Sequence, residues 1–494
     1  MKVFKLKNKD RMDLLAFVLC LFVFLFWALL LTYKFYHFGY YDWDLAYFAQ
    51  GMWNLCHGSV QVTVFGTNFF SNHANLIAYL ILPIYKVFPH PLTLVYLKIA
   101  SIVMAAFVLY VMAKEKLDPK TAILVLFLYL IYAPNIFGVI YEFDFESLAP
   151  VFLMLILYFY VKERWLGFLS CAAILVLIKE NMPFIILAFS IHGLFTKKDK
   201  IRFGVIPGIF ALISFYLLVY VFIPYMANLP IGKQIPFYYL GDNYKDMGGS
   251  ASGIISSMIF HPFKTLHYLM TPLNFGFLVA IFNPLMYLSL GSPGILFLIS
   301  PVFLQHLLSA SVTEHEIRFA YVLTMAPFLF LAAVETLRLL YKNFRKEYYL
   351  TLVLLVIVNA VILTINFHVF KERFVGKEAW QETKEDVQDQ WKLVHLIPPE
   401  ASVVASFSFL APLSQRADLY TFYHMYDPKY QNDQWSYQLP SNVRYALIDR
   451  LDPWLLKEDN YPLAQERVRK FFNSGGWKVH KKYGRFCLYE REAR

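Results

Sequence analysis

Apolar segments about 20 residues long recur between residues 14 and 367, and they constrain the fold of this chain more than any other feature. A helix of roughly 20 residues crosses the hydrocarbon core of a bilayer, which is about 30 Å thick. The chain is 58% hydrophobic and 19% aromatic, a composition that excludes an ordinary soluble enzyme. We predict an α-helical, multi-pass membrane protein with about 11 transmembrane helices.

Lysines and arginines gather in short connections between the apolar segments, for example at residues 114–120 and 197–202. The positive-inside rule places such loops in the cytoplasm, and the basic N-terminus belongs on the same side. The first span, residues 14–32, is too long for a signal peptide and no cleavage site follows it, so we expect it to be retained. The net charge of +10 therefore reflects topology in the cytoplasmic membrane, and no nucleic-acid partner is expected.

Loops on the opposite side are longer and carry acids and histidines. The first of them, residues 33–91, contains two helical stretches at 46–57 and 76–88 that we expect to lie in the membrane interface. A second long outer loop covers residues 227–261. Together with the apolar spans, these loops form a predicted transmembrane domain of residues 1–369.

From about residue 370 the composition changes to that of a soluble domain, with charged residues interleaved among apolar ones. The pattern predicts, in chain order, a helix at 382–396, strands at 402–405 and 445–448, a helix at 464–472 and a strand pair at 478–489. We therefore expect a small extracytoplasmic α/β domain over residues 370–494. It carries no metal, phosphate or nucleophile motif of its own.

Two acids, Asp42 and Asp44, follow the first span on its outer side. Carboxylates beside a membrane are costly to keep partly desolvated, so they call for a functional explanation. A positioned carboxylate can take the proton from an acceptor hydroxyl during glycosyl transfer, which makes Asp44 the leading candidate for a general base. Asp44 also precedes the predicted helix and could serve as its N-cap, and one residue could do both.

Other polar residues of the outer loops could complete a site. His73 could orient a ligand or form an interfacial hydrogen bond. Asp144 and Glu146, two residues apart, could bind sugar hydroxyls or a divalent metal, or could be solvated. The fork of Arg318, close to His315, suits the phosphate of a lipid-linked donor, and pairing with a neighbouring glutamate is the alternative.

Lys179 and Glu180 lie between two short apolar segments. Adjacent opposite charges at such a place form either an outward polar turn or a buried functional pair. The sequence alone leaves both open.

The run of residues 44–54, with His57 and Gly58, resembles the opening motif of a bacterial and archaeal multi-pass membrane family catalogued as a domain of unknown function. That family is in turn similar to GT-C glycosyltransferases. The matching segments continue at residues 68–73, 82–85, 88–89, 148–150, 179–180, 326–330 and 397–402. Two departures stand out, since the family usually has a second Asp at Ala49 and a His-Pro pair at Asp144-Phe145.

The resemblance implies a GT-C-like fold, an outward active site under the first long loop, and a polyprenyl-phosphate sugar as donor. We therefore expect a glycosyltransferase that passes a sugar to an extracytoplasmic glycan, lipid or protein. Asp44 would be the base with Asp42 assisting, and the predicted substrate-binding residues are His73, Asp144, Glu146, Lys179, Glu180, His315 and Arg318. Membrane lipids are expected partners; no cofactor is required by any motif, and a divalent metal between the acids stays open.

Two other classes of function compete with this interpretation. A lipid or solute transporter would explain the many spans, but no inverted repeat and no paired Gly/Pro-interrupted helices are present in the two halves. A membrane scaffold without catalytic activity would leave the acids without a role.

Overall fold

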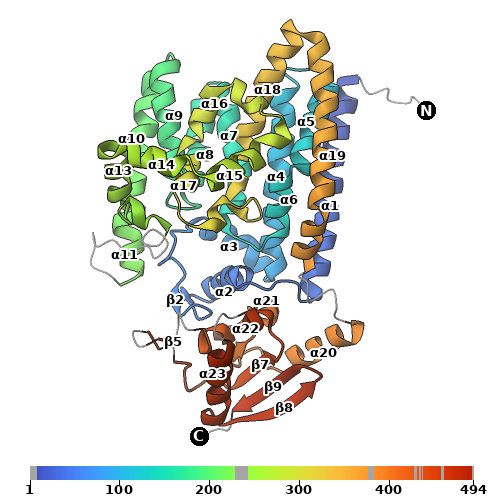
Figure 1. The fold of residues 1–494 in the computed structure, drawn as a ribbon, viewed down its shortest axis with the longest axis vertical. Helices are drawn as coiled ribbons and strands as arrows, with labels where there is room; N and C mark the ends of the chain where they lie inside the picture. Colours follow the sequence, from blue (N-terminus) through green and yellow to red (C-terminus); the bar gives the residue numbers. More distant parts are fainter. Residues whose placement is uncertain are drawn as a thin grey trace, which may run out of the picture.

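The computed structural model describes residues 8–228, 243–375, 383–427, 431–432, 435–436, 438–457 and 461–491. Residues 229–242, in the predicted second outer loop, lie outside this set. The described part consists of a helical bundle with a five-stranded sheet at one end of it (Figure 1). The chain is thus mostly helical, with a small C-terminal sheet, in agreement with the predicted class.

Four helices in the described part are long and apolar enough to cross a membrane. They are α1 (Asn8–Tyr36), α4 (Pro91–Ala113), the continuous helix Ile201–Met226 that includes α10 (Ile206–Tyr216), and α19 (Arg345–Val375). Two bent pairs raise the number to six if each pair is one span. Shorter apolar helices pack among them: α3 (Ile77–Val87), α7 (Ala149–Val161), α8 (Trp165–Val176) and α9 (Met182–Thr196). The count of 11 spans stays a prediction.

Prolines divide several apolar segments that the sequence pattern presents as continuous. The first bent pair is α5 (Pro119–Ile131) with α6 (Ala133–Ile140), at 46°, and the second is α14 (Pro262–Leu269) with α15 (Pro272–Phe282), at 58°. The predicted span at 295–308 is likewise two helices, α16 (Pro293–Leu298) and α17 (Ser300–Leu307). Proline lacks the N–H of the helical ladder and suits a first helical turn, and each of these helices has a proline as its first or second residue.

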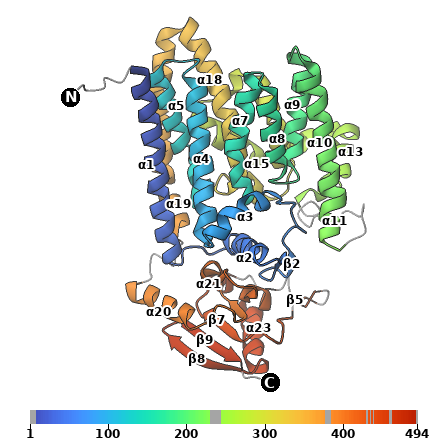
Figure 2. The ribbon, with the colours of Figure 1, turned by 180° about the vertical axis from the view of Figure 1, so that it is seen from behind.

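Basic turns lie at one end of the bundle and the sheet lies at the other. The turn between α9 and α10 and the turn between α18 (Ala326–Asn343) and α19 are at the end where the N-terminus also lies (Figure 2). Lys197, Arg202, Lys342 and Arg345 lie in these turns or in the helical turns next to them. The separation of charge agrees with the loop pattern of the sequence, while the orientation in the membrane stays a prediction.

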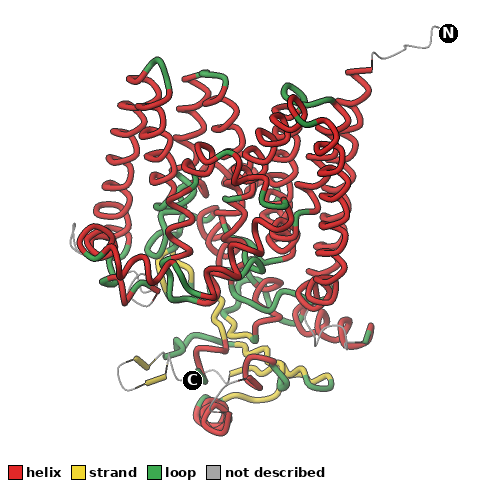
Figure 3. Tube along the Cα trace, turned by 45° about the horizontal axis from the view of Figure 1, so that its top comes forward, coloured by secondary structure: helices red, strands yellow, loops and turns green. Residues whose placement is uncertain are grey.

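The sheet has the strand order β4-β3-β7-β9-β8, and its strands lie on one side of the helical part (Figure 3). The strands are β3 (Val403–Ala405), β4 (Leu419–Thr421), β7 (Tyr445–Asp449), β8 (Trp477–Tyr483) and β9 (Phe486–Arg491). β3 pairs in parallel with β4 and β7, whereas β9 is antiparallel to both of its neighbours. The described helices of this region are α20 (Lys384–His395), α21 (Phe407–Leu413), α22 (Pro453–Lys457) and α23 (Tyr461–Ser474).

The helix α2 (Asp44–Cys56) lies between the bundle and the sheet (Figure 1). Gln50 of this helix donates from Nε2 to the Ala417 carbonyl at 2.9 Å and to Thr63 Oγ1 at 2.7 Å. Thr63 Oγ1 in turn donates to the Leu419 carbonyl of β4 at 2.7 Å. Trp454 Nε1 donates to the Tyr41 carbonyl at 2.7 Å, just before α2. The sheet region therefore binds the chain on both sides of Asp42 and Asp44, at Tyr41 and at Gln50.

Replacing Gln50 with alanine should weaken the contact between α2 and the sheet region. The fully buried Gln50 amide donates to the Ala417 carbonyl of the sheet region and accepts from the Val64 amide of the first outer loop. We expect the free energy of unfolding to fall by about 2 kcal/mol, the usual effect of leaving buried polar groups unsatisfied. Denaturant unfolding of the purified protein in detergent measures it. Gln61→Ala, at an exposed position of the segment that follows α2, is the control and should change stability by less than about 0.5 kcal/mol. Equal effects of the two changes would contradict the assignment.

Candidate functional site

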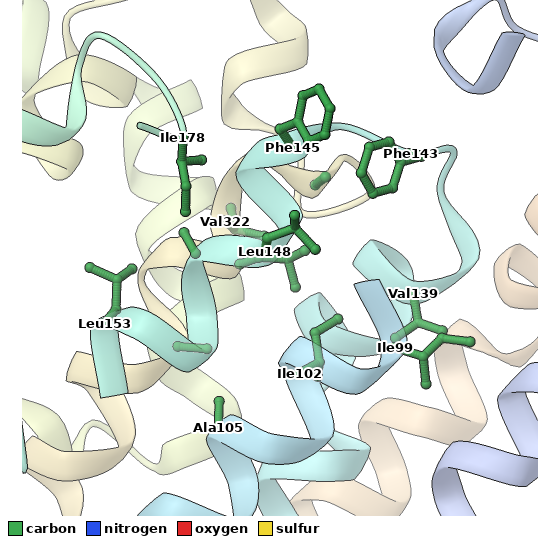
Figure 4. Packing of buried hydrophobic residues seen from close by; sticks show 14 of the residues in the cluster. Ile99, Ile102, Ala105, Val139, Phe143, Phe145, Leu148, Leu153, Ile178 and Val322 are labelled. Atoms are coloured by element: carbon green, nitrogen blue, oxygen red, sulfur yellow. The ribbon is translucent and has the colours of Figure 1, made fainter. Parts of the chain in front are cut away.

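Aromatic and acidic residues alternate in the segment that joins α6 to α7. The rings of Phe143 and Phe145 are fully buried, with centroids 5.3 Å apart, and both pack against Phe48 of α2. Figure 4 shows both rings in the apolar cluster that also contains Leu148 and Val322. The two buried rings anchor the segment, so the intervening acids are held in defined positions beside α2.

Glu142, the first of these acids, caps α2. Its Oε1 accepts a hydrogen bond from the Asp42 amide at 2.8 Å, and its Oε2 accepts one from the Leu45 amide at 2.9 Å. Trp43 is the N-cap residue and makes no side-chain capping bond. Asp44 therefore does not cap the helix, and that alternative is wrong. Its Oδ2 instead accepts a hydrogen bond from the Tyr141 hydroxyl at 2.8 Å.

Asp42, Asp44 and Glu142 form a first cluster, whose carboxyl groups lie close enough to shift one another's pKa. Burial, with the charges of Asp42 and Glu142, raises the pKa of Asp44 well above its usual range, against the opposing hydrogen bond from Tyr141. Burial and the charge of Asp42 raise the pKa of Glu142 to about 7. A carboxylate with a raised pKa is a stronger base once it ionises, which suits Asp44 to proton transfer.

A second cluster contains His73, Lys179 and Glu180. His73 Nδ1 lies 2.8 Å from Glu180 Oε1, and Lys179 Nζ lies 2.7 Å from Glu146 Oε2. Lys179 and Glu180 are therefore a buried pair of neighbours, each bound to a different element, and not a solvated turn. Burial alone would raise the pKa of Glu180, but the His73 and Lys179 charges outweigh it and lower this pKa to about 2.

Asp144 stands between the two clusters. Its Oδ1 accepts a hydrogen bond from the Glu146 amide at 2.6 Å and so starts the 3-10 turn η1 (Phe145–Leu148). Its charge raises the pKa of Asp44 in the first cluster. In the second, burial works to lower the pKa of Lys179, but the charges of Glu146 and Asp144 raise it well above its usual range. The acids at 144 and 146 therefore connect both groups.

A cavity of about 400 Å³ opens beside the second cluster. Its polar lining includes His73, Lys179, Glu180, Asn181, Asn243, Tyr244, Gln305, Thr313, Glu314 and Tyr321. Its apolar lining includes Phe184, Phe215, Val219, Ile254, Ile255 and Met258, from α9, the Ile201–Met226 helix and α13 (Ala251–Phe260). The cavity thus has a charged end and a hydrocarbon-like side.

An aromatic path connects this cavity to Asp44. Tyr321 lines the cavity and stacks on Phe319, with ring centroids 5.8 Å apart. Phe319 packs against Tyr141 at 5.4 Å, and the Tyr141 hydroxyl bonds Asp44. Asp44 itself does not line the cavity. The side chains of Tyr321, Phe319 and Tyr141 form the path between the cavity and Asp44.

Two predicted substrate-binding residues lie apart from this arrangement. His315 is buried, with Nδ1 2.9 Å from the Ser311 carbonyl, and packs against Phe277. Arg318 has 46% of its side chain exposed and lies 4.0 Å from Glu316 Oε2. Neither residue lines the cavity.

No three His, Cys, Asp or Glu side chains come together as a metal site in the described ranges. A divalent metal between the acids stays a prediction, and we derive no step through one.

Sequence reasoning assigned no role to several residues of the site. Tyr141 and Glu142 were visible only as part of the acidic segment, and Glu314 only as a possible salt-bridge partner of Arg318. Gln305 and Tyr321 carry no local signal. A signal did exist for Lys34 and Lys98, which are lysines within or at the end of apolar spans. Ionisable residues at such depth are functional candidates by default.

The bundle, the C-terminal sheet and the buried charged clusters define a multi-pass membrane protein. Residues 34–482 match the family described as a predicted membrane protein, DUF2079, and the chain belongs to this family. The resemblance inferred from residues 44–54 is confirmed at that level. No curated protein matches the sequence.

Two solved structures are similar in their backbone. The crystal structure of the Archaeoglobus fulgidus oligosaccharyltransferase in complex with Zn and sulfate is 13% identical, with 94% of this chain and 72% of that chain covered and a TM-score of 0.47. The oligosaccharyltransferase AglB from the same archaeon, in complex with an inhibitory peptide and a dolichol-phosphate, is 12% identical, with 96% and 74% covered and a TM-score of 0.44. Likenesses this distant show no shared activity, so the function rests on the site itself.

The raised pKa of Glu142 predicts a pH dependence of stability. Folding moves this pKa from its ordinary 4.5 to about 7, so the folded protein holds a proton that the unfolded chain releases between these values. The contribution of Glu142 to stability is therefore fully present below pH 4.5 and is lost as the pH rises through 7. Melting temperatures of the wild type should fall across this range more steeply than those of Glu142→Gln. Parallel profiles would contradict the assignment.

Proposed function

We propose that this protein is a glycosyltransferase of the cytoplasmic membrane. It moves a sugar from a polyprenyl-phosphate donor to a glycan, lipid or protein on the extracytoplasmic side. The proposal rests on the cavity of about 400 Å³, which has an apolar wall on one side and Lys179 at its charged end. Contacts between Tyr321, Phe319 and Tyr141 connect this cavity to Asp44.

The lining of the cavity suits a lipid phosphate. The apolar side chains of Phe184, Phe215 and Met258 match an isoprenoid chain. Among the described residues that line the cavity, Lys179 is the one lysine or arginine, and its ammonium has three N–H donors. The described bond to Glu146 uses one of them, so the others can reach phosphate oxygens. Arg318 lies away from the lining, which favours Lys179 for the donor phosphate.

The polar end also suits sugar hydroxyls. Asn181 Oδ1 is buried and accepts no hydrogen bond from the described residues. Glu314 pairs with His306, whose Nδ1 lies 3.0 Å from Glu314 Oε2 and 2.6 Å from the Glu314 carbonyl. Asn181 and Glu314 both line the cavity. Buried acceptors normally find a donor, and hydroxyl groups of a bound sugar would supply it.

Asp44 does not line the cavity, so the proposed reaction takes place where the sugar of a bound donor extends past Tyr321 toward Asp44. A general base must lie within hydrogen-bond distance of the hydroxyl that it deprotonates. The acceptor hydroxyl attacks the anomeric carbon while its proton passes to the Asp44 carboxylate, and the bond to the donor phosphate breaks with its electrons staying on the phosphate oxygen. Lys179 stabilises the negative charge that grows on this leaving group. Asp42 and Asp144 favour the protonated form of Asp44 and so drive proton uptake. His73 holds Glu180 in the cavity wall.

Asp44→Asn should reduce transfer by about 10²- to 10⁴-fold, the usual contribution of a general base. Proteoliposomes with the purified protein, a radiolabelled polyprenyl-phosphate hexose and an extract of native envelope as acceptor source give the rate. Asp418→Asn, in the sheet region, is the matched control and should transfer at the wild-type rate. Near-normal transfer by the Asp44 variant would remove Asp44 from this role.

Lys179→Met should lose the lipid donor, because a neutral side chain no longer offsets the phosphate charge. Native mass spectrometry of the detergent-purified protein should show a co-purified polyprenyl phosphate, or its sugar conjugate, on the wild type. Arg318→Ala, outside the cavity lining, should retain it. Ordinary phospholipids alone, equal in all three proteins, would contradict the donor assignment and favour a transporter or a scaffold.

A further inference from the structure

Two lysines of the bundle, Lys34 of α1 and Lys98 of α4, are almost completely withdrawn from the surface. Lys34 is 3% exposed and Lys98 is 0% exposed. A charged side chain in an apolar span costs several kcal/mol, so it persists where its partners make it useful.

Both lysines bind the end of α6. Lys34 Nζ donates to the Ile140 carbonyl at 2.9 Å, and Lys98 Nζ donates to the Tyr141 carbonyl at 2.6 Å and to the Glu142 carbonyl at 3.1 Å. The last carbonyls of a helix have no partner within the helix, and cations there are favourable. The two ammonium groups thus fix three successive carbonyls at the point where α6 becomes the Tyr141-Glu142 turn.

The Tyr141-Glu142 turn positions the loop at residues 42–45, where α2 begins. The Tyr141 hydroxyl donates to the Asp44 carboxylate, and the Glu142 carboxylate accepts from the amides of Asp42 and Leu45. Three side-chain hydrogen bonds of Tyr141 and Glu142 therefore tie the position of residues 42–45 to the position of the Tyr141-Glu142 backbone.

We propose that Lys34 and Lys98 are positioning residues, which set the place of the Asp44 carboxylate by holding the Tyr141-Glu142 turn. Neither lysine lines the cavity, so neither contacts the donor there. The consequence for catalysis rests on the proposed role of Asp44, whereas the holding of the loop does not. A merely structural lysine would lower the stability of the whole bundle without loosening this loop in particular.

Hydrogen exchange with mass spectrometry tests the mechanical part on the full-length protein in detergent. Lys98→Met keeps the length of the side chain and removes both bonds. We expect amide exchange in residues 41–48 to become at least about tenfold faster, with the remaining α4 peptides unchanged. Lys114→Met is the matched control, because Lys114 caps the other end of α4 and pairs with Asp13 there. It should leave residues 41–48 unchanged.

Steady-state transfer by the same proteins tests the catalytic part. Lys98→Met should lower kcat at least about tenfold while KM for the donor stays the same, since the donor site is intact. Faster exchange with an unchanged kcat, or unchanged exchange in residues 41–48, would overturn the proposal. If the wild type transfers no sugar, the proposed function fails, and the exchange result still decides whether the lysines hold the loop. Lys34→Met replaces Lys98→Met if the latter does not fold.

Discussion

The hydrogen bonds that Glu142 accepts from the Asp42 and Leu45 amides join two loops that lie about 100 residues apart in the sequence. One loop follows the first membrane helix and the other leads into α7. Because the carboxylate satisfies amides at the start of α2, the position of that helix depends on where Glu142 lies. The buried rings of Phe143 and Phe145 anchor the segment of Glu142, and Lys98 donates to the Glu142 carbonyl.

The C-terminal sheet belongs to the same arrangement. Gln50 and Thr63 bond carbonyls of the β4 region, Trp454 bonds the Tyr41 carbonyl, and one hydrophobic core continues from the helices to Val403, Leu447 and Leu488 of the sheet. α2 is therefore held between two packed bodies. A helix fixed on both sides can keep a carboxylate in one place, which a loop open to solvent cannot do as well.

The buried charges are distributed so that each has a partner of opposite sign or a set of polar contacts. Glu180 pairs with His73, Glu146 pairs with Lys179, and Asp44 accepts from Tyr141. Such pairs offset only part of the cost of desolvation, so they add little net stability. The pairs of Glu180 and Glu146 lie beside the cavity with an apolar wall, where Lys179 and Glu180 are part of its lining.

The sequence by itself determined the membrane class, the family, the position of α2 and, in the C-terminal region, the elements α20, β3, β7, α23 and the pair β8 and β9. It did not show α21 or β4, which lie between β3 and β7. Apolar periodicity, prolines and turn residues act locally, so they are visible without a structure. The tertiary structure decided which residues form the site, because Lys98 meets Tyr141 at a separation of 43 residues and His73 meets Glu180 at a separation of 107. It also showed that Glu142, and not Asp44, caps α2, and that Arg318 lies outside the cavity lining. Local patterns carry no information on such pairings, since these depend on how distant helices pack.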